Sequence, residues 1–139
     1  MYSNTELYKI ALKARENAYA PYSNFKVGAV VLSEHDKLFG GCNVENASYP
    51  CGTCAEAGAI SAMIAGGEKA IKEILIVADT KRILPCGNCL QKIAEFADET
   101  TLVHSADMNG NIKTFKLKEL LPQNFKSEDM NNETGSRIY

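Results

Sequence analysis

The sequence predicts an α/β domain of three layers (α/β/α), in which helices cover both faces of a five-stranded mixed sheet. Segments with helical spacing of apolar residues alternate with short apolar runs typical of strands. The last two of these runs flank Asn109-Gly110, a hairpin signal, and are too close for a parallel crossover, so they should be antiparallel. At 139 residues, the chain has room for a single domain, 1–139, with a polar C-terminal tail from about residue 126.

The individual elements follow from spacing and from helix-breaking residues. Apolar residues from Leu7 to Ala18 recur at helical spacing, and Pro21 with the polar residues after it ends this first helix. The other helices are expected at 53–65, which Gly66-Gly67 ends, after Pro85, and at 117–121 before Pro122. The strands are expected at 25–32, 38–44, 74–78, 101–104 and 112–115.

The composition excludes several classes of partner. A formal net charge of −2 without a basic stripe argues against nucleic acid. No apolar run approaches the ~20 residues that span a bilayer, and the polar N-terminus does not resemble a signal peptide. We therefore expect a cytoplasmic protein with no nucleic-acid or membrane partner, whose five cysteines stay reduced and are available to a metal.

Two short motifs carry the chemistry. Cys54-Ala-Glu56 lies at the start of one predicted helix, and Cys86-Gly-Asn-Cys89 begins the next one after Pro85. Zinc prefers sulfur ligands, and helix N-termini favour thiolates. Three thiols can hold zinc and leave a fourth position open, with a carboxylate beside it as a proton carrier.

Each motif also permits a structural interpretation. Cys51 and Cys54 form a second Cys-x-x-Cys pair, so the four thiols could make a closed structural zinc site. Thr53 and Glu56 fit the capping box, in which Glu56 only satisfies a backbone donor.

The combination of ligand-x-Glu with Pro-Cys-x-x-Cys resembles the zinc-dependent nucleoside and nucleobase deaminases. Segments 20–29, 41–47 and 119–122 extend the similarity to the small homotetrameric cytidine deaminases, over about residues 5–130. The resemblance implies hydrolytic deamination of cytidine and deoxycytidine to uridine and deoxyuridine with release of ammonia, a reaction of pyrimidine salvage.

The same resemblance implies roles for individual residues. Cys54, Cys86 and Cys89 would hold one Zn²⁺ per chain with water as the fourth ligand, and Glu56 would carry protons. Phe125 would reach the pocket of a neighbouring subunit, which implies a homotetramer with shared active sites. The remaining substrate-binding residues would be Phe25 near the base, Asn43 and Glu45 on the ribose hydroxyls, Ala55 through its backbone, and Tyr49.

The chain departs from the resemblance at two positions. Ala57 and Leu90 stand where many relatives have arginine. The helix N-termini would offset part of the thiolate charge, and Lys92 or Arg82 could offset more of it. The resemblance gives no role to Cys42 or Cys51. Two alternatives stay open: a blasticidin-type or other nucleoside deaminase, and a structural four-cysteine zinc module.

Overall fold

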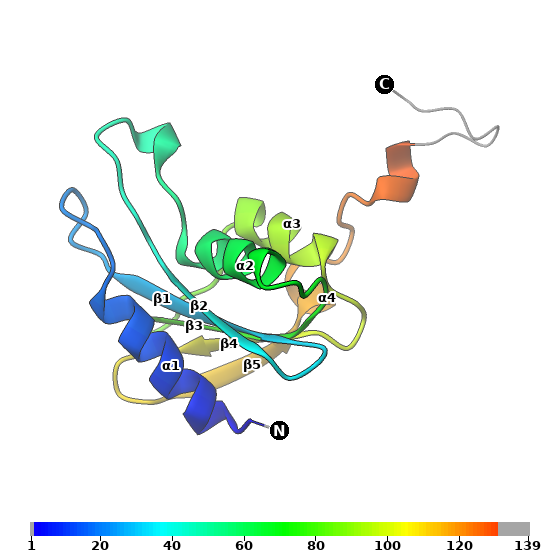
Figure 1. Cartoon of the computed structure of the whole chain (residues 1–139), viewed down its shortest axis with the longest axis horizontal. Helices are drawn as coiled ribbons and strands as arrows, with labels where there is room; N and C mark the ends of the chain where they lie inside the picture. The colour runs from blue at the N-terminus through cyan, green and yellow to red at the C-terminus, as the bar shows by residue number, and fades with distance from the viewer. Residues whose placement is uncertain (1, 131–139) are drawn as a thin grey trace.

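The computed structural model describes residues 2–130. Its centre is a five-stranded sheet in the order β2-β1-β3-β4-β5 (Figure 1). β1 pairs antiparallel with both β2 and β3, β3 pairs parallel with β4, and β4 pairs antiparallel with β5. The predicted mixed sheet is therefore confirmed, and its strands are β1 (Val27–Ser33), β2 (Leu38–Cys42), β3 (Ile71–Ala78), β4 (Leu102–Ala106) and β5 (Ile112–Lys116).

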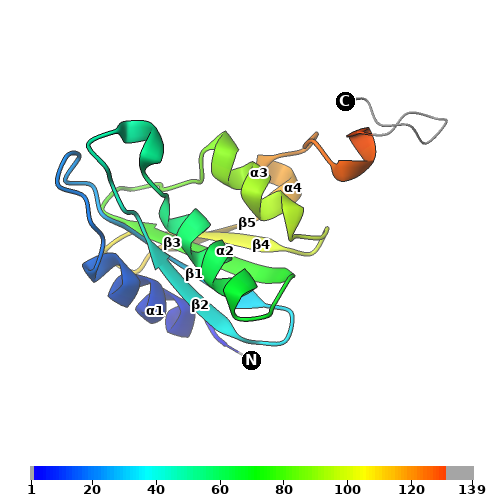
Figure 2. The same cartoon turned by 45° about the horizontal axis from the view of Figure 1, so that its top comes forward.

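Helices cover both faces of the sheet, as a three-layer domain requires (Figure 1, Figure 2). α1 (Asn4–Glu16) lies on one face, where Leu7 packs with Val30, Leu75 and Val77. α2 (Ala55–Ala65) and α3 (Gly87–Glu95) lie on the other face, with Met63 and Ile93 fully buried. The short α4 (Leu117–Leu120) follows β5 and contacts α3.

Two glycines let the helices approach the sheet closely. A Cβ on Gly28 would collide with the carbonyl oxygen of Ala11 in α1, and a Cβ on Gly41 would collide with the backbone of Ala55 and Ala59 in α2. The position of α2 on β2 therefore depends on a missing side chain. This matters for the site because α2 begins with the Cys54 motif.

The element boundaries differ from the expectations where long-range pairing competes with local pattern. α2 begins at Ala55 and not at Thr53, because the backbone of Thr53 pairs with that of Val44. For the same reason β2 ends at Cys42, and Val44 forms isolated bridges beyond it. β3 starts at Ile71, earlier than the apolar run at 74–78, because Ile71 still pairs with Ser33.

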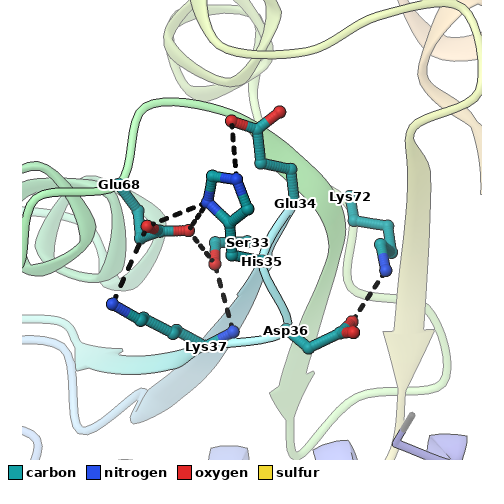
Figure 3. A network of polar contacts seen from close by, with 7 residues as sticks. All are labelled: Ser33, Glu34, His35, Asp36, Lys37, Glu68 and Lys72. Atoms are coloured by element: carbon teal, nitrogen blue, oxygen red, sulfur yellow. Dashed lines mark hydrogen bonds and ion pairs between the residues drawn. The ribbon is translucent and has the colours of Figure 1, made fainter.

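A buried carboxylate fastens the turn between β1 and β2 to the loop after α2 (Figure 3). Glu68 accepts a hydrogen bond from Ser33 Oγ at 2.6 Å, lies 3.0 Å from His35 Nδ1, and pairs with Lys37 Nζ at 4.0 Å. The Ser33 hydrogen bond, followed by the contacts to His35 and Lys37, holds the pKa of Glu68 below its usual value. A second ion pair, Lys72 with Asp36 at 2.7 Å, lies beside this network.

The C-terminal part leads away from the body of the domain after α4 (Figure 1, Figure 2). It contains a short 3₁₀ helix, η2 (Ser127–Met130). Most of the tail predicted from about residue 126 lies outside the described residues. None of the helices in residues 2–130 has the length and apolar character needed to cross a membrane.

Candidate functional site

The two sequence motifs occupy the N-termini of two neighbouring helices. Cys54 is the N-cap of α2 and Cys86 is the N-cap of α3. Cys89 lies in the first turn of α3 and is 1% exposed. Since free N–H groups give a helix N-terminus partial positive charge, both ends favour thiolate side chains.

The thiols gather around Cys89. Its sulfur interacts with the side chains of Cys54 and Glu56, and the charges that act on it come from Glu56, Cys54 and Cys86. Burial raises the pKa of the Cys89 thiol, and these negative neighbours raise it further. A soft donor set of this kind suits Zn²⁺, whose charge would reverse that penalty.

The thiols are close together without forming a finished ligand shell. Within residues 2–130, no three His, Cys, Asp or Glu side chains stand in a ready-made metal-binding arrangement. Cys54 is half-buried and Cys86 is exposed, so both can reorient. The donor chemistry fits zinc, and the exposed Cys86 and half-buried Cys54 are free to adjust around Cys89.

Glu56 is the buried carboxyl group of this cluster. It lies in the first turn of α2 and is 6% exposed. Burial raises the pKa of Glu56, which its backbone hydrogen bond, the Cys89 contact and the charge of Lys92 partly offset. Because the N-cap is Cys54 and not Thr53, Glu56 does not occupy the third helical position that a capping box needs.

A short bridge brings the predicted sugar-binding residues next to this cluster. The Val44 N–H donates to Thr53 O at 2.9 Å, and the Thr53 N–H donates back to Val44 O at 2.8 Å. On its other side, Val44 pairs with Tyr19. Asn43 and Glu45 therefore flank a residue that is hydrogen-bonded to the one preceding Cys54.

Asn43 and Glu45 both organise the loop between α1 and β1. The Asn43 amide donates to Phe25 O at 2.8 Å and accepts from the Val27 N–H at 2.9 Å. The Glu45 carboxylate accepts from the N–H groups of Tyr22 and Ser23 at 3.0 and 3.1 Å and from the Ser23 hydroxyl. These bonds, led by that of the Ser23 hydroxyl, hold the pKa of Glu45 below its usual value.

A pocket of about 340 Å³ opens at this loop. Tyr22 and Tyr49 stand edge to face across it, with ring centroids 6.3 Å apart. The segments that carry them extend together from one end of the sheet (Figure 1, Figure 2). The pocket is lined by Tyr22, Ser23, Glu45, Asn46, Tyr49 and Gly52, so it covers the sugar-binding part of the predicted site and not the thiols.

The other predicted residues are placed as follows. Ala55 is buried at the first position of α2, and Phe25 is 39% exposed in the loop that Asn43 and Glu45 hold. Tyr49 is 77% exposed in η1 (Tyr49–Cys51). Phe125 is 50% exposed, and its carbonyl oxygen accepts from Gln91 Nε2 at 2.8 Å. The segment after α4, to which it belongs, and the loop between α1 and β1 lie on opposite sides of the molecule (Figure 1, Figure 2).

One of the two positions that depart from the resemblance, Ala57, borders a separate hollow. Ala57 and Lys92 both line a space of about 370 Å³ between α2 and α3. Lys92 is the cation whose charge acts on Glu56. Of the two candidates for offsetting negative charge, the geometry therefore favours Lys92.

Cys51 is separate from this cluster. It is exposed in η1, and its thiol donates a hydrogen bond to Ser48 Oγ, with 3.6 Å between the sulfur and the oxygen. Sequence reasoning also misses a role for Ser23, which lies in the turn after Pro21 and in the segment 20–29. No local signal indicates that its hydroxyl meets a carboxylate 22 positions away.

Known proteins share the fold of this chain and a large part of its sequence. Residues 1–105 match the family model described as "Cytidine and deoxycytidylate deaminase zinc-binding region". A cytidine deaminase of Halalkalibacterium halodurans is 43% identical over 127 residues, covering 91% of this chain and 96% of its own length. A cytidine deaminase of Sporosarcina psychrophila is 41% identical over 119 residues, covering 85% of this chain and 88% of its own.

The structural comparison agrees. The crystal structure of a cytidine deaminase from Burkholderia pseudomallei superposes with a TM-score of 0.85 at 41% identity, covering 89% of this chain and 100% of that one. A shared three-layer fold and shared sequence over this length define an enzyme family. The chain belongs to the cytidine and deoxycytidylate deaminase family.

Proposed function

We propose that this protein is a zinc-dependent cytidine deaminase, which hydrolyses cytidine and deoxycytidine to uridine and deoxyuridine with release of ammonia. The observation that carries the proposal is the buried Glu56 carboxyl in contact with Cys89, between two helix N-termini that each present a thiol. Family membership supports the same reaction. Its metabolic place would be pyrimidine salvage in the cytoplasm.

Cys54, Cys86 and Cys89 are the proposed ligands of one Zn²⁺ per chain. The family model is described as a zinc-binding region and covers all three. When bound, zinc would supply Lewis-acid activation of a water molecule for attack on C4 of the base. Three thiolates leave excess negative charge, which the two helix N-termini and Lys92 would offset.

Glu56 is the proposed proton carrier. It would accept the proton of the attacking water, place it on N3 of the pyrimidine, and later deliver a proton to the departing amine. Burial raises the pKa of Glu56, which is the direction that favours a carboxyl able to hold a proton during the reaction. Ala55, one residue earlier, would contact the base through its backbone.

The pocket at Glu45 is proposed to bind the ribose. Asn43 and Glu45 would bond its hydroxyls, and Phe25 and Tyr49 would lie near the base. Glu45 is a carboxylate with a lowered pKa, and the residues that line this pocket include no lysine or arginine. An anionic pocket repels a 5′-phosphate, so a free nucleoside is favoured over a nucleotide or a polynucleotide.

Phe125 is proposed to complete the pocket of a neighbouring subunit in a homotetramer. Several aromatic side chains support association, because they stand exposed without a covering segment in residues 2–130. These are Tyr19, at 55% exposed, with Tyr22, Phe25, Tyr49 and Phe125.

A spectrophotometric assay of cytidine conversion to uridine on zinc-quantified protein tests the proposal. Turnover with release of ammonia supports it. Blasticidin S and deoxycytidine, assayed in parallel, separate the alternative deaminase substrates. Zinc bound by four sulfurs with no turnover on any of these would identify the structural four-cysteine module instead.

A further inference from the structure

We propose that Ser23 is a positioning residue of this site, whose hydroxyl fixes the Glu45 carboxylate in the orientation that accepts the ribose hydroxyls. The inference rests on the proposed function of the Glu45 pocket. Ser23 itself has no part in the roles given above to Phe25, Asn43 and Glu45.

The first observation is that the Ser23 hydroxyl both donates and accepts a hydrogen bond. Its hydroxyl donates to one oxygen of Glu45, and its oxygen accepts from the Phe25 N–H at 3.0 Å. A single side chain therefore links a predicted sugar ligand to the backbone of a predicted base contact. Alanine would remove both links at once.

The second observation is that the other Glu45 oxygen is held separately. The N–H groups of Tyr22 and Ser23 both donate to Oε1, whereas the Ser23 hydroxyl contacts Oε2. If only Oε1 were held, Oε2 could still change its position through rotation about the side-chain bonds of Glu45. The Ser23 hydroxyl therefore removes the remaining freedom of the group and fixes which lone pairs face the pocket.

The third observation is that Ser23 belongs to the pocket wall and also holds the neighbouring Phe25 in place. Ser23 lines the pocket together with Tyr22 and Tyr49, whose rings meet edge to face. Phe25 is held at its carbonyl oxygen by Asn43 and at its N–H by Ser23. The loop is thus fastened to the 43–45 segment through Asn43 and Glu45, and the Ser23 hydroxyl supplies the side-chain bond to the carboxylate beside the two backbone N–H groups.

Ser23→Ala tests this role with two substrates that differ only in the sugar. For cytidine, KM should rise about tenfold or more while kcat stays within about threefold. The reason is that Glu45, without the Ser23 hydroxyl, would bind the ribose less well in the ground state and in the transition state alike. 2′,3′-Dideoxycytidine lacks both of these hydroxyls. For this substrate, the rise in KM caused by Ser23→Ala should be about fivefold smaller than the rise for cytidine.

Two further variants keep the interpretation unambiguous. Ser23→Thr retains a hydroxyl and should restore KM for cytidine to within about threefold of the parent enzyme. Ser61→Ala, an exposed serine of α2, is the matched control and should leave KM unchanged for both substrates.

The outcomes separate the inference from the proposed function. Equal rises in KM for cytidine and dideoxycytidine, or no rise for either, would overturn the role of Ser23, since a merely structural effect does not depend on the sugar hydroxyls. Failure of the parent enzyme to turn over any cytosine nucleoside would instead reject the proposed function. Thermal unfolding of each variant verifies that the compared proteins are folded.

Discussion

At the scale of single residues, the chemistry depends on where burial places one carboxyl group. The spacing Cys54-x-Glu56 is compatible with a helix cap, and only the packed structure separates the two interpretations. Glu56 is buried beside Cys89 and sits at the second position of α2. Its raised pKa is a consequence of that burial.

Glu56→Gln should keep zinc and lose turnover by about 10²–10⁴-fold, because glutamine preserves the shape of the side chain but cannot transfer a proton. The measurement pairs the cytidine assay with zinc quantification. Glu99→Gln, at an exposed position in the loop before β4, is the control. Turnover of the Glu56 variant near that of the parent would remove Glu56 from the mechanism.

Cys54→Ser should release zinc, whereas Cys51→Ser should retain it. The reason is that Cys54 interacts with Cys89, while Cys51 lies in η1 against Ser48. Metal content after gel filtration in the presence of a weak chelator measures the difference. The reverse pattern would assign the ligand to Cys51 and reject the proposed set.

At the scale of elements, the sequence predicted boundaries that depend on local turn residues and missed those that depend on long-range pairing. Gly66-Gly67 and Pro85 indicate where α2 ends and α3 begins, since their effects are local. The start of α2 could not be predicted to the residue, because Thr53 is drawn into pairing with Val44. The Ser23–Glu45 contact could not be predicted for the same reason, because it joins two loops that are 22 positions apart in the sequence.

Gly41→Ala should destabilise the protein by about 1–3 kcal/mol and reduce turnover, because the new methyl group collides with the backbone of α2 and displaces the helix that carries Glu56. Gly40→Ala is the matched control, since its Cβ would lie 3.6 Å from Ala14 Cβ in ordinary contact. Denaturant unfolding and the cytidine assay give both readouts. Equal stability of the two variants would contradict the close packing of α2 on β2.

Glu68→Gln should lower the Tm by a few degrees at neutral pH. The carboxylate has a lowered pKa in the folded chain, so its stabilisation is present above the unfolded pKa of about 4.3 and is lost as pH falls through the folded value. The Tm difference between variant and parent should therefore shrink below about pH 4. Glu99→Gln, exposed in the loop before β4, is the control, and a difference that stays constant down to acidic pH would exclude the ionised network.

At the scale of the whole molecule, the three-layer fold brings the N-termini of α2 and α3 together and leaves an aromatic surface uncovered. The alternation of helical and strand-like segments was sufficient to predict the layers and the antiparallel final pair. The sequence could not show that the segment after α4 lies across the molecule from the loop between α1 and β1 (Figure 1, Figure 2), because the course of the chain after α4 is set by contacts such as Gln91 to the Phe125 carbonyl. That separation is what sharing of active sites between subunits requires.

Mixed oligomers test the sharing. Phe125→Ala and Glu56→Gln should each be poorly active alone, yet co-expressed chains should regain turnover, since an intact Phe125 from one subunit would complete a site with an intact Glu56 in another. Activity above the sum of the two separate variants is the expected result. A strictly additive result, or a monomer in sedimentation measurements, would contradict shared sites.

The most direct test of the central claim is a zinc titration of metal-free protein, with cytidine turnover and metal content measured on the same samples. Turnover should rise in proportion to bound zinc and reach its maximum at one zinc per chain. Full turnover without zinc, or bound zinc without turnover of cytidine, would contradict a catalytic metal centre at Cys54, Cys86 and Cys89.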